Sequence, residues 1–179
     1  EINERIFEYD QLIICGPVYP HEVVGFSGGN KYLFPGISGA QITNLTHWLA
    51  GLIGNLNIIG YNDTPVRRLL DRVATFIPIP KACFSLVIKG ESSIAGLYFG
   101  SPEESQAAAA ALSAQINVRY VNRTYHTVLS VMPTIYDDLW TACKGMFKAE
   151  PVVADGGTLI IYAPHIDQVS YTHGTVLDR

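Results

Sequence analysis

The sequence predicts an α/β protein built from parts of two α/β domains, and three observations lead to this prediction. Short apolar runs alternate with amphipathic stretches along the chain, as they do in strand–helix–strand crossovers. Apolar residues make up 48% of the 179 residues and charged residues only 16%, which leaves ample material for a buried core. The character of the sequence changes over 115–123, so we expect one domain part over 1–116 and a second over 117–179.

The expected elements follow from local pattern. Strands are expected where short apolar runs are bounded by turn residues: 11–15, 82–89, 94–99, 124–131 and 158–163. Helices are expected where apolar residues recur at helical spacing: 40–52, 65–74, 101–114 and 136–148. Thr64 and Ser101 each precede a proline and are the expected N-caps of two of these helices. We also expect a Gly-rich loop over 20–39, a turn at Gly156-Gly157, and a right-handed parallel crossover in the second part.

Charge and hydropathy argue against two classes of partner. The net charge is −4 and the twelve Lys and Arg are scattered, whereas a nucleic-acid surface needs a clustered basic stripe. The longest stretch without charges, 32–62, is interrupted by Pro35 and several glycines, so no run reaches membrane-spanning length. We therefore expect no nucleic-acid and no membrane partner. The three cysteines have no metal-ligand spacing and indicate reduced thiols of a cytoplasmic protein.

The two ends of the chain suggest a section of a longer protein. The chain opens with Glu1 rather than Met and carries no signal peptide, and it stops abruptly at Arg179. We therefore expect a protein fragment.

The densest group of reactive side chains lies between His21 and His47. His21 opens the run HEVVGFSGGNK, Lys31 closes it, and Leu33-Phe34-Pro35-Gly36 follows before His47. A Gly-Gly loop that carries Ser27 and Lys31 is a candidate anion cradle, because its backbone N–H groups can converge on a phosphate. The loop fits neither the Walker pattern nor the glycine spacing of dinucleotide-binding folds. The glycines alone are therefore a weak signal.

The spacing of these residues closely resembles the nickel-dependent lactate racemase family. That family has a His, a Gly-Phe-Ser-Gly-Gly-x-Lys loop, a Leu-Pro-Gly turn and a second His at the same intervals. The resemblance continues through 138–146, where this chain has DLWTACKGM, and through the Gly-Gly-Thr-Leu-Ile run at 156–160. It covers essentially the whole chain and implies two α/β domains of the lactate racemase type.

The resemblance implies a covalently held cofactor. In the family, the loop lysine forms a thioamide link to the nickel-pincer nucleotide, a pyridinium-3,5-dithiocarboxylate mononucleotide. Its nickel is held by two sulfurs and one ring carbon, and a histidine supplies the fourth ligand. Lys31 would then be the anchor in a cofactor-binding loop with Ser27, Gly28 and Gly29, and His47 would be the metal ligand. A lysine must be neutral to attack a thioacid, and burial in a weakly charged loop would favour that form. Nickel accepts soft donors together with an imidazole.

The resemblance also implies the reaction. A racemase or epimerase of 2-hydroxy acids, such as lactate, moves a hydride while a base takes the hydroxyl proton, and histidine suits that task near neutral pH. His21 would be one of two catalytic acid/base histidines, and Lys144 would lie near the substrate or cofactor. The expected partners are the small hydroxy acid and the cofactor-synthesis enzymes.

Some departures from the family pattern affect these expectations. The second acid/base histidine and the residues for the cofactor phosphate would lie before the start of this chain, so we expect the isolated fragment to be inactive and without cofactor. Asn30 replaces a common Arg, while Trp140 and Thr141 stand where relatives often have Tyr and Gln. A larger or sugar-derived hydroxy acid is therefore a possible substrate.

Two alternatives stay open. A zinc-dependent hydrolase would use His21 and His47 with His165 or His173, although their spacing matches no familiar zinc motif. A non-catalytic module would keep the glycine loop to hold a nucleotide or another anion. Lys144 near a helix end is also a common partner of the helix dipole.

Overall fold

The computed structural model describes residues 1–90, 92–171 and 174. Contacts between Cα atoms divide the chain into two compact units, Glu1–Arg119 and Tyr120–Arg179. The division expected from the sequence lay between 116 and 117. The α/β class predicted from the sequence is confirmed, because helices alternate with strands and each unit contains a parallel strand pair.

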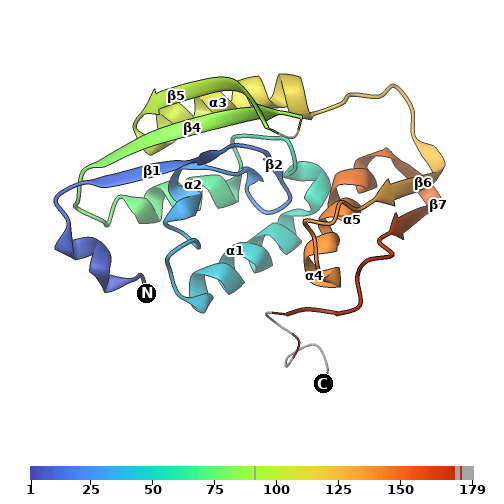
Figure 1. The fold of residues 1–179 in the computed structure, drawn as a ribbon, viewed down its shortest axis with the longest axis horizontal. Coiled ribbons are helices and arrows are strands. Elements are labelled where there is room, and N and C mark those ends of the chain that lie inside the picture. The colour runs from blue at the N-terminus through green and yellow to red at the C-terminus, as the bar shows by residue number, and fades with distance from the viewer. Residues whose placement is uncertain (91, 172–173, 175–179) are drawn as a thin grey trace. The chain divides into compact units, whose positions relative to one another are not determined.

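The first unit holds one three-stranded sheet, its helices and a small hairpin (Figure 1). Its strands are β1 Leu12–Pro17, β2 Pro20–His21, β3 Gly25–Phe26, β4 Lys81–Lys89 and β5 Ser93–Gly100. Its α-helices are α1 Ala40–Ile53, α2 Pro65–Ala74 and α3 Pro102–Asn117. Short 3-10 turns are η1 Glu4–Glu8, η2 Gly29–Tyr32 and η3 Asn55–Asn57.

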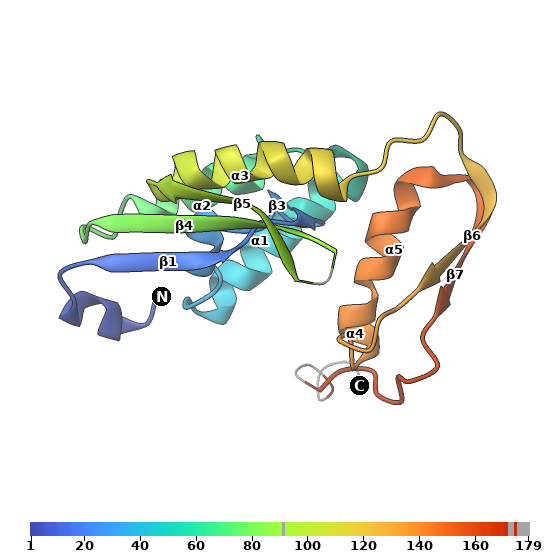
Figure 2. The same cartoon turned by 45° about the horizontal axis from the view of Figure 1, so that its top comes forward.

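The main sheet has the order β1-β4-β5, with β4 in the centre. β1 pairs in parallel with β4, and α1 and α2 lie between them in the sequence, as expected for a crossover. β4 and β5 form the predicted antiparallel hairpin, and α3 runs alongside them (Figure 2).

Local capping confirms two predicted helix starts. Thr64 Oγ1 accepts the backbone N–H of Arg67, and Ser101 Oγ accepts that of Glu104. Each bond satisfies a donor that the first turn of a helix leaves without a partner.

Two apolar clusters form the core of the first unit. The larger one joins β1, β4, α2 and the segments before and after α1, with fully buried members such as Ile58, Val66 and Leu70. The smaller one joins Val18 and Phe26 to β4 and α3. The segment between β1 and α1 therefore contributes to both clusters and is held between the sheet and the helices.

The second unit contains a parallel pair, β6 Tyr125–Val131 and β7 Val153–Tyr162. Between them come α4 Leu139–Ala142, α5 Lys144–Ala149 and the 3-10 turn η4 Glu150–Val152. α5 contacts both strands, so the predicted strand–helix–strand crossover is present.

Two predicted details of the second unit are wrong. The helix expected over 136–148 begins at Leu139, because Asp138 acts as N-cap and its side chain accepts the N–H of Thr141. It also divides at Cys143 into α4 and α5. Gly156 lies inside β7 with φ of 73°, and the ladder shifts register in the facing part of β6. The Gly pair thus forms an irregularity within the strand instead of a turn before it.

Within the part of the chain that is described, no helix has both the length and the apolar character to cross a membrane.

Candidate cofactor and active site

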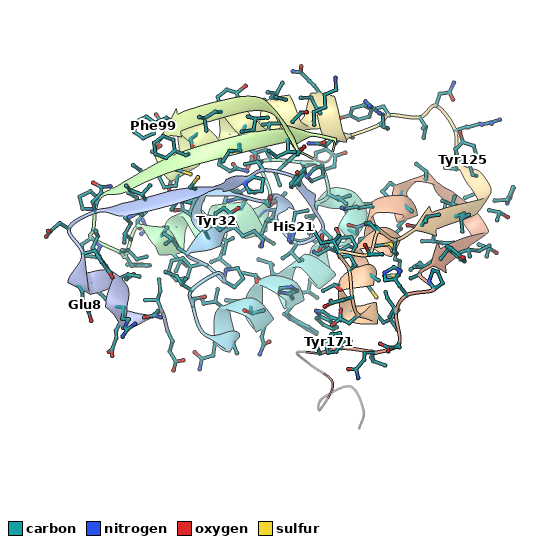
Figure 3. The ribbon with its side chains drawn as sticks, in the orientation of Figure 1. Glu8, His21, Tyr32, Phe99, Tyr125 and Tyr171 are labelled. Carbon is teal, nitrogen blue, oxygen red and sulfur yellow. The ribbon has the colours of Figure 1, made fainter. Side chains whose placement is uncertain are left out.

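The stretch over 20–39, expected to be a Gly-rich loop, contains two short strands and a 3-10 turn. β2 and β3 pair Pro20 with Phe26 and His21 with Gly25, and η2 follows at once. His21 and Tyr32, labelled in Figure 3, mark the two ends of this segment. The Tyr32 hydroxyl donates to the carbonyl of Pro17, 3.5 Å away, which ties η2 to β1.

Gly28 and Gly29 are required by packing within the protein. Their φ angles are 85° and 58°, in the region that L side chains rarely adopt. A Cβ on Gly28 would lie 2.6 Å from the side chain of Val18. A Cβ on Gly29 would lie 2.9 Å from both the Gln106 side chain and the Pro102 carbonyl oxygen. The close approach that the glycines permit is therefore an approach to Val18, just after β1, and to the first turns of α3.

Ser27 fastens the loop to the chain that leaves β1. Its Oγ accepts the backbone N–H of Tyr19 at 2.9 Å and donates to the carbonyl of Pro17 at 3.1 Å. The Ser27 N–H also donates to the Tyr19 carbonyl at 2.8 Å. These three bonds give Ser27 a structural role in addition to the cofactor-binding role expected for it.

Side chains from α2 and α3 hold the remaining loop residues. Arg67 is 4% exposed, and its two terminal nitrogens donate to the carbonyls of Phe26 and Gly28. Gln106, 2% exposed, donates to the carbonyl of Ser27 at 3.3 Å. Asn30 is fully buried, and its amide nitrogen donates to carboxylates of both helices.

Those two carboxylates belong to Asp71, 3.0 Å from the Asn30 amide nitrogen, and Glu103, 2.6 Å from it. Burial lowers the pKa of Arg67, and the charges of Asp71 and Glu103 oppose that shift. Burial likewise raises the pKa of Asp71, against the lowering effects of the Asn30 hydrogen bond and the Arg67 charge. The Arg67 guanidinium is thus buried away from water, and the negative charges of Asp71 and Glu103 offset part of the cost of burying its charge.

His21 lies at the end of β2 and is half-buried. Its Nδ1 accepts the backbone N–H of Val23 at 3.0 Å, so the neutral ring carries its proton on Nε2. Glu22 Oε2 lies 3.7 Å from the same Nδ1, where its charge favours the protonated imidazolium. The ring thus has one partner that favours the neutral form and another that favours the charged form.

His47 is an exposed residue of α1, on the flank of the face that Thr46 and Ala50 bury. Its Nδ1 is 2.7 Å from the carbonyl of Thr43, one turn earlier. A carbonyl can only accept, so Nδ1 carries the proton and Nε2 presents its lone pair. This is the tautomer that binds a metal through Nε2, with the other ring nitrogen oriented by a backbone carbonyl.

Lys31 is half-buried in η2, next to the residues that α2 and α3 hold. Its backbone N–H donates to the Gly28 carbonyl at 3.3 Å, and the same oxygen accepts from Arg67 at 3.1 Å. The main chain at Lys31 is therefore joined through one carbonyl oxygen to a buried cation.

The structure brings most of the predicted site residues into the first unit. His21, the Ser27–Lys31 run and His47 all lie there, whereas Lys144 begins α5 in the second unit. His165 is also in the second unit, with Nε2 2.9 Å from the Tyr136 carbonyl. His173, named in the zinc alternative, lies outside the described residues.

The residues of α2 and α3 that hold the loop in place were not predicted from the sequence. Arg67 and Asp71 are four residues apart on α2, and the apolar pattern by itself predicts only that both belong to this helix. Their positions border the buried stripe of Val66 and Leu70, so an Arg–Asp pair at that spacing was a usable signal. Glu103, an acid in the first turn of α3, accepts from Asn30 as Asp71 does.

The described residues do not form a metal-binding cluster by themselves. Among the residues that the structure describes, no three His, Cys, Asp or Glu side chains are close enough together to hold an ion. The zinc alternative therefore has no three-ligand set within those residues, whereas a cofactor that brings its own sulfur and carbon donors needs a single imidazole.

Comparisons with known proteins point to one family. Residues 1–55 match the lactate racemase N-terminal domain. Over 173 residues the chain is 25% identical to the lactate racemase of Thermoanaerobacterium thermosaccharolyticum, covering 93% of this chain and 39% of that enzyme. The fold matches the apoprotein structure of the lactate racemase from that organism with a TM-score of 0.78 and 25% identity, over 92% of this chain and 40% of the other. It also matches a crystal structure of a Thermotoga maritima protein with a TM-score of 0.84 and 33% identity, over 95% and 44% of the two chains.

The resemblance to the lactate racemase family that the sequence motifs indicated is therefore confirmed. It extends over nearly the whole chain, and the α/β fold is similar to that of the matching part of a lactate racemase. The chain spans about two fifths of the length of these relatives.

Proposed function

We propose that this chain is the cofactor-anchoring part of a 2-hydroxy-acid racemase or epimerase. In this proposal the reaction is proton-coupled hydride transfer to a nickel-pincer nucleotide linked to Lys31. The observation that carries the proposal is the His21–Lys31–His47 register in a chain related to lactate racemases throughout. The substrate is a small 2-hydroxy acid, either lactate or a larger relative.

The residues present fit such a cofactor. Lys31 supplies an amine on a segment held by two helices, as attachment at a defined point requires. His47 presents the unprotonated Nε2 that a nickel ion would need, because Thr43 fixes its tautomer. When bound, the group supplies the nickel and an acceptor for the substrate hydride.

His21 would move the proton in this proposal. With Nδ1 accepting from Val23, the neutral ring holds its proton at Nε2. The general acid would be the imidazolium, which carries Nδ1–H toward Glu22 and gives up its Nε2 proton. To act as a base, the ring must present Nε2 without its proton, and Nδ1–H would then face Glu22 instead of the Val23 N–H. Glu22 thus offers a partner for Nδ1–H in both the acid and the base form of the ring.

Lys144 would contribute from the second unit. A lysine near the substrate could pair with the carboxylate of a 2-hydroxy acid.

The proposal is tested on full-length protein made together with the cofactor-synthesis enzymes. We expect intact-mass analysis to show an adduct that peptide mapping places on Lys31, nickel in the purified protein, and loss of optical purity in at least one acid from a panel of chiral 2-hydroxy acids. Lys31→Arg keeps the charge but cannot form the thioamide, so it should carry no adduct and racemise nothing.

Two results would contradict the proposal and favour an alternative. Zinc in place of nickel, with Lys31 unmodified, would support a hydrolase. Reversible nucleotide binding to unmodified Lys31 would support a non-catalytic binding module. Racemisation that survives Lys31→Arg would also refute the anchoring role.

A further inference from the structure

We infer that Arg67 is a positioning residue that sets the main chain at Lys31. This inference rests on the proposed function for its link to the cofactor, but its structural basis is independent of it. Arg67 is not expected to touch substrate or cofactor, since it is 4% exposed and it donates to the loop and to its own helix cap.

The geometry shows how Arg67 would act. Its two terminal nitrogens bridge the carbonyls of Phe26 and Gly28, so one planar fork holds two peptide units of the loop, on either side of the Ser27 carbonyl. The Gly28 carbonyl also accepts the backbone N–H of Lys31. A shift of the guanidinium would therefore move the acceptor that fixes the first turn of η2.

The other contacts hold the same residues from a second side. Gln106 binds the Ser27 carbonyl, Gly29 packs against Gln106, and Asn30 binds the acids of both helices. Each of the five residues before Lys31 is thus in contact with a side chain of α2 or α3, with Arg67 deepest among the charged ones.

The cost of this arrangement argues for a role beyond stability. Burial lowers the pKa of Arg67, which shows that the protein environment disfavours its charge, and the buried Nε atom has no hydrogen-bond partner. The amide oxygen of Asn30 is likewise buried without a partner. Well-packed apolar side chains are often as stable as a buried ionic group, so a polar group kept at such a cost is more useful for fixing a conformation than for stabilising the fold.

The test compares three variants. Arg67→Met keeps the length but removes charge and donors, and Arg67→Lys keeps the charge but cannot bridge two carbonyls. Arg68→Met is the matched control, since Arg68 is the next residue on α2, is exposed, and pairs with Asp63 at the surface. All measurements are made at temperatures well below the thermal unfolding midpoint of each variant.

Hydrogen exchange on the present chain gives a readout that needs no cofactor. We expect the amides of 27–33 to exchange at least roughly tenfold faster in Arg67→Met, with protection in β4 and α3 unchanged. In full-length protein made with the cofactor-synthesis enzymes, the fraction carrying the Lys31 adduct should fall by about tenfold or more, because small misplacements of a reacting group are costly. Arg67→Lys should lie between Arg67→Met and wild type, and Arg68→Met should match wild type in both assays.

Equal loop exchange in Arg67→Met and Arg68→Met would overturn the inference. Loss of protection spread evenly through the first unit would also overturn it, because Arg67 would then serve the fold in general. If Arg67→Met does not fold, Arg67→Lys carries the same comparison. Absence of an adduct from wild-type protein would instead contradict the proposed function, and the exchange result would still decide the role of Arg67.

Discussion

Gly29 and Gly51 show how differently two glycines of one unit are used. Gly29 has a positive φ and packs against the Pro102 carbonyl, whereas a Cβ on Gly51, in α1, would meet nothing within 4 Å. We expect Gly29→Ala to lower the free energy of unfolding by about 2 kcal/mol or more, from backbone strain and overpacking. Gly51→Ala should raise it by about 0.5–1 kcal/mol through helix propensity. Urea unfolding followed by circular dichroism measures both, and equal effects of the two substitutions would refute this account of the loop.

Asp138 provides a pH-dependent contribution in the second unit. Hydrogen bonds from the Thr141 hydroxyl and then the Thr141 amide hold the pKa of Asp138 below its ordinary value, and the Tyr171 amide adds to them. A carboxylate with a lowered pKa in the folded state stabilises the fold above its unfolded pKa, and the benefit is lost as the pH falls through the folded value. Asp138→Asn should therefore destabilise the protein at pH 7, and its difference from wild type should shrink below about pH 4.

Urea unfolding midpoints of wild type and Asp138→Asn, measured from pH 7 to below about pH 4, test the direction of this pH dependence. Asp137→Asn is the matched control, because Asp137 is the adjacent residue and is exposed. The explanation would be wrong if the Asp138→Asn difference grew as the pH fell, or if Asp137→Asn behaved in the same way.

The catalytic role of His21 leads to a kinetic prediction. His21→Asn removes the group proposed to move the hydroxyl proton but leaves Lys31 in place. In full-length, cofactor-loaded protein we expect kcat to fall by about 10²–10⁴-fold, the usual contribution of a general acid or base. The Lys31 adduct should persist at the wild-type level by intact mass. Unchanged kcat would assign His21 to the structure of the hairpin instead.

At the scale of elements, α3 connects the sheet to the loop and depends on its first turn. Ser101 Oγ accepts the N–H of Glu104 at 3.2 Å and donates to its carboxylate at 2.8 Å. Ser101→Ala should lower the free energy of unfolding by about 1 kcal/mol. Ser92→Ala, at an exposed position in the β4–β5 turn, should change it by less than about 0.5 kcal/mol. Equal urea midpoints for the two variants would show that the cap contributes nothing.

The elements that were predictable are those with local causes. The helix over 65–74 could be read from Thr64, Pro65 and a helical apolar pattern, because a cap and its helix are adjacent in the chain. The division of the helix near Cys143 was not predictable from periodicity, since the pattern continues through it while Asp138 sets a later start. Gly156 indicated a turn, but tertiary pairing with β6 placed it inside a strand.

The candidate site likewise has one part that the sequence predicts and another part that it does not. His21, Lys31 and His47 could be found because their spacing is a property of the sequence. The contacts of Arg67 with Phe26 and Gly28 join residues about 40 positions apart, so they depend on how α2 packs against the loop. Sequence spacing identifies the reactive groups, but only the folded structure shows which residues hold them in position.

At the scale of the whole molecule, the connection between the two units should be the first site of proteolysis. Val118 to Thr124 belongs to no helix or strand, and Arg119 and Arg123 are both exposed within it. Proteases cut fastest where a segment can enter the active site without unfolding a packed element. Limited trypsin digestion should therefore cut first after Arg119 or Arg123 and release pieces whose masses match the two units. Arg119→Gln combined with Arg123→Gln should slow the first cut by roughly tenfold, while Arg68→Gln, on the exposed face of α2, should leave it unchanged. An initial cut within α2 or β4 would mean that the first unit opens more readily than the connection, and the division into two compact units would then be wrong as a description of the folded chain.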